Sequence, residues 1–153
     1  MNQSERRIYL IKRLLEERGD CASAQIPYGS GEQRRLLRSL MNVRMPGDID
    51  DEFLMIQDEY LTQVNDEKGI VELCDIPEIQ KDTYVWCGDI TRLAVPSIVN
   101  AANSGMTGCY IPCHACIDNC IHTFAGVQLI WHPGRLFSYT VRACCLLYTS
   151  PSP

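Results

Sequence analysis

The sequence predicts an α/β domain preceded by a helical extension, and three patterns lead to this prediction. Apolar residues recur at helical spacing through most of residues 1–68, whereas residues 84–87, Tyr-Val-Trp-Cys, have the composition of a strand. Residues 88–126 then contain, in order, an apolar run, a loop crowded with cysteine and histidine, and a short helix. We therefore place the boundary between a helical region, 1–80, and an α/β region, 81–129, near residue 80.

The first two helices are expected at residues 4–18 and 32–42. Ser4 is the predicted N-cap of the first, and Gly19 supplies a left-handed stop. The second carries a basic face, which we interpret as solvated, because charge runs are more often solvated faces than binding surfaces.

A third helix is expected after Asp50, which can cap it, and before Gly69, which ends it. Acidic residues follow Asp50 directly and suit the helix dipole. Tyr60 lies on the apolar stripe of this helix and is predicted to be in the core.

Strands are expected at residues 84–87 and 94–100, the second apolar at Ile98 and Val99. After the loop that follows, we expect Asp118 to open a short helix. In an open α/β sheet, ligands bind beyond the carboxyl ends of strands, and helix N-termini attract anions. The sequence therefore points to a ligand that carries phosphate.

Composition narrows the class of protein. The net charge of -5 argues against a general nucleic-acid or membrane surface. The N-terminus lacks an apolar signal core, and no stretch reaches the ~18 apolar residues of a membrane helix, so we expect a cytoplasmic protein without membrane or nucleic-acid partners.

Cysteine usage is unusual. Four of the nine cysteines fall between Cys109 and Cys120, a clustering that suits metal binding or reactive thiols better than a disulfide framework. Cys109-x4-His114-x-Cys116 offers two thiolates and an imidazole, and three protein ligands leave zinc an open position. Cys113 competes as a ligand through its Cys-x2-Cys spacing with Cys116, and ordinary buried cysteines are the remaining alternative.

Two further motifs carry a family resemblance, Gly88-Asp89-Ile90-Thr91 and Ile98-Val99-Asn100-Ala101-Ala102-Asn103. They resemble the macrodomain family, whose sheet binds ADP-ribose. In place of the usual glycine-rich loop, residues 108–119 are similar to the zinc-dependent bacterial and fungal branch, whose members remove ADP-ribose from proteins. The resemblance extends back into the N-terminal region and stops near Leu129.

The resemblance implies a binding role for several residues. Asp89 would accept a hydrogen bond from the adenine amino group, and Ile90 would contribute its backbone. Asn103 would bind the distal ribose, while Asn100 would fix the loop beside the ligand. The remaining positions are two glycines that would permit close approach of the backbone to the ligand, Gly105 and Gly108.

The resemblance also implies the reacting groups. Cys109, His114 and Cys116 match the zinc ligands of that branch, and Asp118 matches an aspartate beside the distal ribose. With Asn103 binding the ribose, Asp118 would orient or deprotonate the attacking group. Further along the helix, Cys120 and His122 are expected to be structural.

The implied fold is a three-layer macrodomain-like sheet, here incomplete, and the implied reaction is zinc-dependent release of ADP-ribose from an ADP-ribosylated protein. A non-catalytic ADP-ribose reader is one alternative. A structural zinc protein is another, in which a fourth ligand such as Cys113 would close the metal site.

The last residues, 130–153, do not continue the pattern. His132-Pro133-Gly134 interrupts the first possible element, and the end is rich in proline. We expect this tail to be foreign or frame-shifted sequence and the chain to be cut short after about Leu129. Without the family's second phosphate-binding loop, hydrolysis by this chain should be weak or absent.

Overall fold

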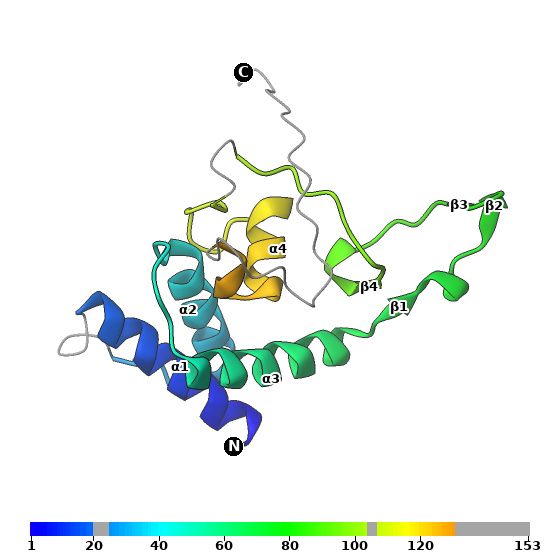
Figure 1. Cartoon of the computed structure of the whole chain (residues 1–153). Coiled ribbons are helices and arrows are strands. Elements are labelled where there is room, and N and C mark those ends of the chain that lie inside the picture. Colours follow the sequence, from blue (N-terminus) through cyan, green and yellow to red (C-terminus); the bar gives the residue numbers. More distant parts are fainter. Residues whose placement is uncertain (20–24, 104–106, 131–153) are drawn as a thin grey trace.

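The structure is a computed structural model, and it describes residues 1–19, 25–103 and 107–130. Within these ranges it contains four α-helices, four short strands and three 3₁₀ segments. The mixed α/β class predicted from the sequence is therefore confirmed, and the helices account for most of the regular secondary structure (Figure 1).

Helix α1 (Gln3–Arg18) begins with a capping box that the sequence analysis did not identify. Asn2 Oδ1 accepts a hydrogen bond from the Glu5 amide at 2.9 Å, and the Glu5 carboxylate accepts one from the Asn2 amide at 2.8 Å. The prediction of Ser4 as the cap is wrong, because the helix has already begun there. Gly19 ends the helix with φ 76°, as predicted.

Helices α2 (Ser30–Val43) and α3 (Asp51–Lys68) follow, α2 starting two residues before the predicted range. Asp50 caps α3 as predicted, since its side chain accepts a hydrogen bond from the Phe53 amide at 2.8 Å. Gly69 ends α3 with φ 81°.

The hydrophobic core lies between the first three helices. Helix α1 packs against both α2 and α3 (Figure 1). The buried side chains come from one face of each of these helices, together with Val127 further along the chain. Tyr60 is among them, as predicted. The others are Leu10, Ile11, Leu14, Leu15, Leu37, Leu40, Met41, Phe53, Ile56, Leu61 and Val127.

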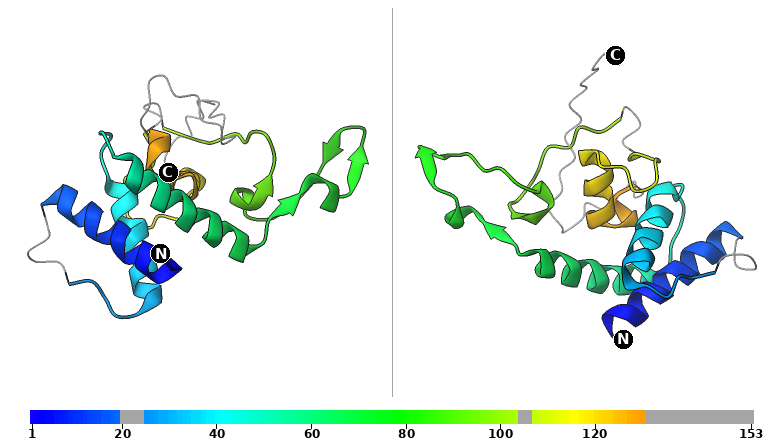
Figure 2. Two further views of the ribbon diagram at one scale, coloured as in Figure 1. Left: turned by 60° about the horizontal axis from the view of Figure 1, so that its bottom comes forward. Right: turned by 180° about the vertical axis from the view of Figure 1, so that it is seen from behind.

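The strands are short and form two separate pairs. Strand β1 (Val71–Glu72) runs parallel to β4 (Leu93–Ala94), and β2 (Glu78–Gln80) runs antiparallel to β3 (Thr83–Tyr84). Figures 1 and 2 show that β2 and β3 extend away from the helices.

The predicted strands are only partly present. Of residues 84–87 only Tyr84 is in a strand, and of residues 94–100 only Ala94, with an isolated bridge at Asn100. A strand needs a partner for its backbone groups, and the described residues supply one to only a few positions. They form no three-layer sheet, and that arrangement stays a prediction.

Helix α4 (Ile117–Ala125) packs against α2 and α3 and is followed by the 3₁₀ segment η3 (Val127–Ile130). Its N-cap is Cys116, whose Sγ accepts a hydrogen bond from the Asn119 amide at 3.4 Å. The prediction that Asp118 opens the helix is therefore wrong by one residue, since the helix begins at Ile117 and Asp118 lies in its first turn.

Gly126 joins α4 to η3 with φ 89°, a conformation that favours glycine. A Cβ at this position would overlap the side-chain amides of Gln57 and Gln128. These two amides hydrogen-bond to each other, and Gln57 Oε1 also accepts a bond from the Val127 amide at 3.0 Å. This buried amide clamp attaches η3 to α3.

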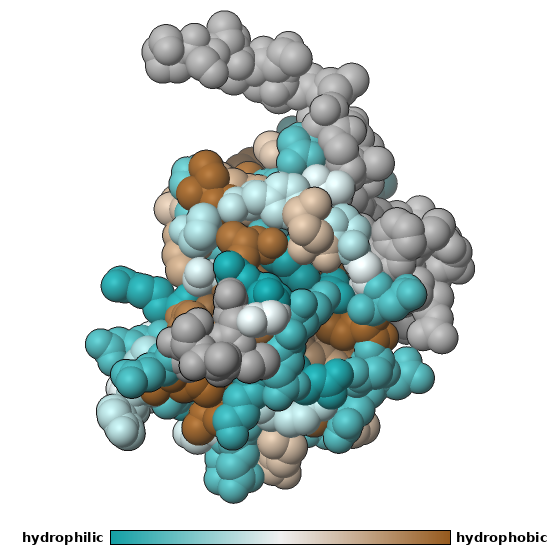
Figure 3. All heavy atoms as spheres, turned by 90° about the vertical axis from the view of Figure 1, so that its left-hand side faces the viewer, coloured by the Kyte–Doolittle hydropathy of each residue, from teal (hydrophilic) through white to brown (hydrophobic). Residues whose placement is uncertain are grey.

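The surface in Figure 3 is mostly hydrophilic, with separate hydrophobic areas. Among the helices of the described ranges, none combines the length and the apolar character needed to cross a membrane. The cytoplasmic location stays a prediction. The tail predicted to be foreign, 130–153, lies outside the described residues apart from Ile130, as does Gly105.

Candidate active site and metal centre

Three predicted metal ligands meet in the loop before α4. The sulfur atoms of Cys109 and Cys116 and a ring nitrogen of His114 all lie within 4.8 Å of one another. Cys109 Sγ is 3.5 Å from His114 Nδ1. With Zn–S of about 2.3 Å and Zn–N of about 2.0 Å, a tetrahedral zinc ion separates such a pair by about 3.5 Å. The donor set and its spacing therefore fit zinc.

Cys113 lies outside this group of three donors. Its Sγ donates to the Arg35 carbonyl at 3.3 Å, and its amide donates to Asn42 Oδ1 at 3.0 Å. Cys113 also has φ 54°, which is uncommon for a residue other than glycine. Cys113 is thus hydrogen-bonded to α2 and is not grouped with the thiols of Cys109 and Cys116.

Asn119 is hydrogen-bonded to the backbone of the loop that contains the three donors. Its side-chain amide donates to the carbonyls of Cys109 and Ile111 at 3.2 and 3.0 Å, and the residue is completely buried. Sequence reasoning missed this residue. Its position directly after Asp118, in the first turn of a helix that follows a metal-ligand motif, was the available signal.

Arg38 holds the same loop from α2. Its Nη2 donates to the His114 carbonyl at 2.7 Å and to Asn119 Oδ1 at 2.8 Å. Our interpretation of the basic face of α2 as merely solvated was therefore wrong for Arg38. No local pattern in the sequence reveals a contact between residues 76 positions apart.

Asp118 is buried between two polar side chains. Asn100 Nδ2 donates to Asp118 Oδ1 at 2.7 Å, and His122 Nε2 lies 3.4 Å from the same oxygen. Burial lowers the pKa of His122, although the charge of Asp118 acts in the opposite direction. A lowered pKa favours the neutral imidazole at pH 7. His122, expected to be structural, thus contacts the predicted reacting carboxylate.

The other ribose-side residues shape the loop. Asn103 Nδ2 donates to the Gly108 carbonyl at 2.8 Å, and Asn103 Oδ1 accepts from the Thr107 amide at 3.4 Å. Gly108 has φ 83°, and a Cβ there would lie 3.0 Å from the ring of His122. The absence of a side chain at Gly108 lets the backbone lie against this ring.

Asp89 lies at the N-cap of the 3₁₀ segment η2 (Ile90–Arg92). It accepts hydrogen bonds from the Thr91 amide and hydroxyl at 3.0 and 2.7 Å, and Lys68 Nζ lies 3.3 Å from its other oxygen. Burial raises the pKa of Asp89, but the bonds from Thr91 and the charge of Lys68 outweigh it and leave the pKa below its usual value. The carboxylate is therefore ionised at neutral pH.

Lys68 is a second residue that sequence reasoning missed. Its ammonium lies 2.9 Å from the centroid of the Phe124 ring, so it links the end of α3 to both α4 and Asp89. Lysine is common in the last turn of a helix, so its presence at this position does not indicate a role in a site.

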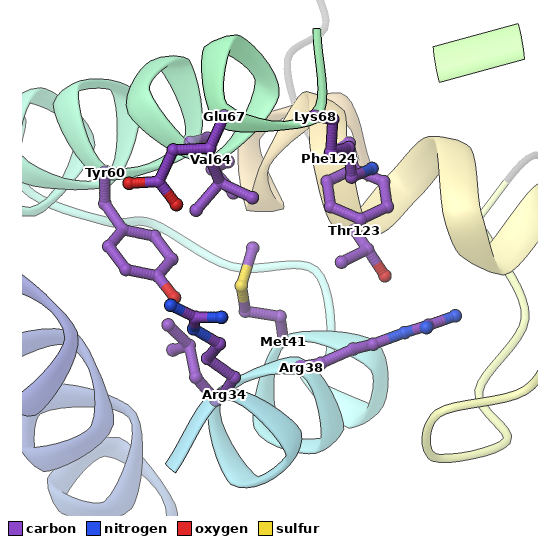
Figure 4. Close-up of a pocket in the computed structure, with 11 residues that line it drawn as sticks. Arg34, Arg38, Met41, Tyr60, Val64, Glu67, Lys68, Thr123 and Phe124 are labelled. Carbon is purple, nitrogen blue, oxygen red and sulfur yellow. The ribbon is translucent and has the colours of Figure 1, made fainter. Parts of the chain in front are cut away.

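A cavity of about 400 Å³ lies between α2, α3 and α4 (Figure 4). Arg38 extends from α2 past Met41, on the side where α4 lies, so its stem lines the cavity while its guanidinium reaches the loop. The lining residues are Arg34, Leu37, Arg38, Met41, Tyr60, Leu61, Val64, Glu67, Lys68, Thr123 and Phe124.

The chain is similar to proteins named for ADP-ribose hydrolysis. It is 59% identical over 133 residues to the protein-ADP-ribose hydrolase of Treponema medium, which covers 84% of this chain and 51% of that protein. It is 43% identical over 122 residues to the protein of the same name from Staphylococcus aureus strain Mu50, covering 79% of this chain and 46% of that protein. No protein-family model matches the chain.

A more distant relative is a probable bifunctional ADP-ribose hydrolase/ADP-ribosyltransferase of Fusarium oxysporum, 36% identical over 105 residues. That match covers 61% of this chain and 18% of the fungal protein. The chain spans about half the length of the bacterial relatives it matches.

Proposed function

We propose that this chain belongs to the zinc-dependent macrodomain family and acts in hydrolysis of the bond between ADP-ribose and a modified protein side chain. The identity of 59% to a protein named for this reaction supports the proposal. In the complete family fold, a three-layer sheet would carry the ligand between the segments that contain Asp89 and Asn103.

The observation that carries the proposal is the placement of Asp118. Its Oδ1 is held by Asn100 and lies near His122, while no described residue donates a hydrogen bond to its Oδ2. Asp118 also lies two residues after Cys116, and its charge acts on that thiol. A fixed carboxylate beside the metal donors is suited to orient or deprotonate an attacking group.

The metal would be held by Cys109, His114 and Cys116. Bound zinc would supply a Lewis acid that holds or polarises the distal ribose, or readies a water. Asn119 and Arg38 fix the backbone around these ligands, so the site is largely preformed. Preformed donors limit the reorganisation that binding requires.

Asp89 is suited to the adenine end of the ligand. An ionised carboxylate has about four acceptor positions, and Thr91 and Lys68 use three of them. One remains for an exocyclic amine. Asn103 is exposed and lies beside Gly108, in the loop where the distal ribose would bind.

A structural zinc site is less well supported. Closed sites use four protein ligands, whereas the group found among the described residues offers three. Cys113, the fourth candidate, is bonded to Arg35 and Asn42 instead. An open metal position also favours an enzyme over a non-catalytic reader.

The test is release of ADP-ribose from a modified carrier protein at equal zinc loading. It compares this chain with a version that continues after Leu129 with the sequence of the Treponema medium relative, because the match covers only 51% of that relative. Asp118→Asn in the longer version should lose roughly 10²- to 10⁴-fold in turnover, the usual contribution of a general base. Full activity of Asp118→Asn, or no release by either version, would refute the proposal.

Zinc content tests the metal site separately. Cys109→Ser and His114→Ala should lose stoichiometric zinc, because each removes one of three ligands. Cys113→Ser is the matched control and should keep it. Equal loss in all three variants would contradict the three-ligand site.

A further inference from the structure

We propose that α2 is a working part of the metal site, in which Arg38 and Asn42 position the donor loop, residues 109–116, for metal binding. This inference deepens the proposed function and rests on it for the identity of the metal. Among the described residues, the hydrogen bonds that Arg38 and Asn42 make to the loop go to its backbone and to Asn119, not to the sulfur or ring atoms of the three donors, so both are positioning residues.

Arg38 fixes two of the three donors through their backbone. Its Nη2 donates to the carbonyl of His114 at 2.7 Å, which sets the position from which the imidazole extends. The same nitrogen donates to Asn119 Oδ1 at 2.8 Å, and Asn119 Nδ2 in turn donates to the Cys109 carbonyl at 3.2 Å. One guanidinium thus connects the backbone of Cys109 to that of His114.

Asn42 supports the middle of the loop. Its Oδ1 accepts from the Cys113 amide at 3.0 Å, and its Nδ2 donates to Thr123 Oγ1 on α4 at 3.0 Å. Asn42 is buried, so these bonds are shielded from water and costly to leave unmade. They tie the loop and α4 to the same point of α2.

The loop needs such support because Cys113 has φ 54°. A residue with a Cβ is strained in this region of backbone conformation and persists there only where its surroundings determine it. The Cys113 amide and Sγ are both bonded to α2, through Asn42 and the Arg35 carbonyl. The strained turn places His114 and Cys116 beside Cys109, so α2 helps to bring the donors together.

Residues that orient metal ligands typically contribute 10- to 100-fold to metal affinity. Arg38→Met keeps an apolar stem along the cavity and removes the hydrogen-bond donors. Arg34→Met is the matched control, because Arg34 lines the same cavity one turn earlier, and no described contact joins it to the loop. Asn42→Leu is a second variant of the same design.

The experiment has two readouts. Hydrogen exchange of the Cys113 and His114 amides, without metal, reports loop order, and titration with Co²⁺ reports affinity and ligand geometry through its absorption bands. Arg38→Met and Asn42→Leu should exchange faster and bind Co²⁺ roughly 10- to 100-fold more weakly, whereas Arg34→Met should match the parent chain. Added guanidinium ion should partly restore Co²⁺ affinity to Arg38→Ala and leave Asn42→Leu unchanged.

The outcomes separate this inference from the proposed function. Unchanged exchange and unchanged Co²⁺ spectra in Arg38→Met and Asn42→Leu overturn the role of α2, even if the chain hydrolyses its substrate. Faster exchange in Arg38→Met and Asn42→Leu, together with a parent chain that binds no metal, supports the bracing of the loop by α2 and refutes the metal site. If Arg38→Met does not fold, Arg38→Lys replaces it, because lysine keeps the charge but cannot donate in the geometry of a guanidinium. Faster exchange and weaker Co²⁺ binding in Arg38→Lys support the role of Arg38, and unchanged values overturn it.

Discussion

The helices α1–α3 and the segment 70–99 differ in how much of their apolar surface is buried. The helices enclose a core in which Leu10 and Ile11 are fully buried, whereas in residues 70–99 only Ile76 is buried. Val85 and Ile79 in that segment are 67% and 64% exposed. A helix satisfies its backbone by itself and needs one apolar face covered, while a strand depends on a neighbour from elsewhere in the chain.

The two regions also differ in what they contribute to the site. Helices α2 and α3 provide Arg38, Asn42 and Lys68, which hold other groups in place. The segment 70–99 provides Asp89, a carboxylate with an acceptor position to spare. The comparison therefore predicts that substitutions in the helices lower stability, and that substitutions in the segment affect ligand binding or nothing.

The largest effect is expected for Phe53→Ala in α3. Phe53 is 1% exposed, and removing a buried aromatic ring costs about 3–5 kcal/mol of unfolding free energy through lost burial and a cavity. Urea unfolding measures it, with Leu54→Ala, partly buried on the same helix, as a milder comparison. A loss below that of Leu54→Ala would show that the core between the helices is not closed.

Asp89→Ala should weaken ADP-ribose binding by about 1–3 kcal/mol, the usual loss for a hydrogen bond to a charged group. Its effect on stability should be at most about 1 kcal/mol, because the Lys68 pair is partly exposed. Calorimetry and urea unfolding measure the two effects. Asp75→Ala, another acidic residue of the segment, is the control, and equal affinity losses in both would contradict the assignment.

Asp50→Ala should cost about 1 kcal/mol, because it removes the N-cap of α3. The hydrogen bond from the Phe53 amide lowers the pKa of Asp50, burial raises it, and Arg13 lowers it further, with a net lowering. A lowered folded-state pKa adds stability above the unfolded value of about 3.9 and loses it as pH falls below. The advantage of the parent over Asp50→Asn should therefore shrink in urea unfolding between pH 5 and about 2.

The smallest effect is expected for Val85→Thr. Val85 is exposed and outside the strands, so the change in unfolding free energy should stay within about 0.5 kcal/mol. Thermal unfolding of both chains measures it. A loss like that of a buried residue would mean that the segment is packed as tightly as the helices.

The sequence was most informative where structure is local. The N-cap of α3 at Asp50, the end of α1 at Gly19 and the burial of Tyr60 follow from capping, glycine geometry and periodicity. The true first cap, Asn2, was missed because asparagine and serine are both good N-cap residues and the two positions lie only two residues apart.

The parts that could not be predicted depend on distance along the chain. The spacing of Cys109, His114 and Cys116 sufficed to suggest a shared site, because eight residues hold them close. The contacts of Arg38 and Lys68 arise only once the helices pack, and no periodicity encodes them. The shortness of the strands could not be predicted for the same reason. The strand propensity of Val85 and Val99 does not supply a neighbouring strand for their backbone groups to pair with.

The clamp between Gln57 and Gln128 has a consequence for mutational tolerance at Gly126. A side chain at Gly126 would require a backbone with φ 89° and would separate the two amides that attach η3 to α3. In a library of all substitutions at this position, selection for soluble folded protein should recover glycine alone. Alanine, elsewhere the mildest replacement for glycine, should be depleted as strongly as the large residues, because the first carbon added already meets the clamp.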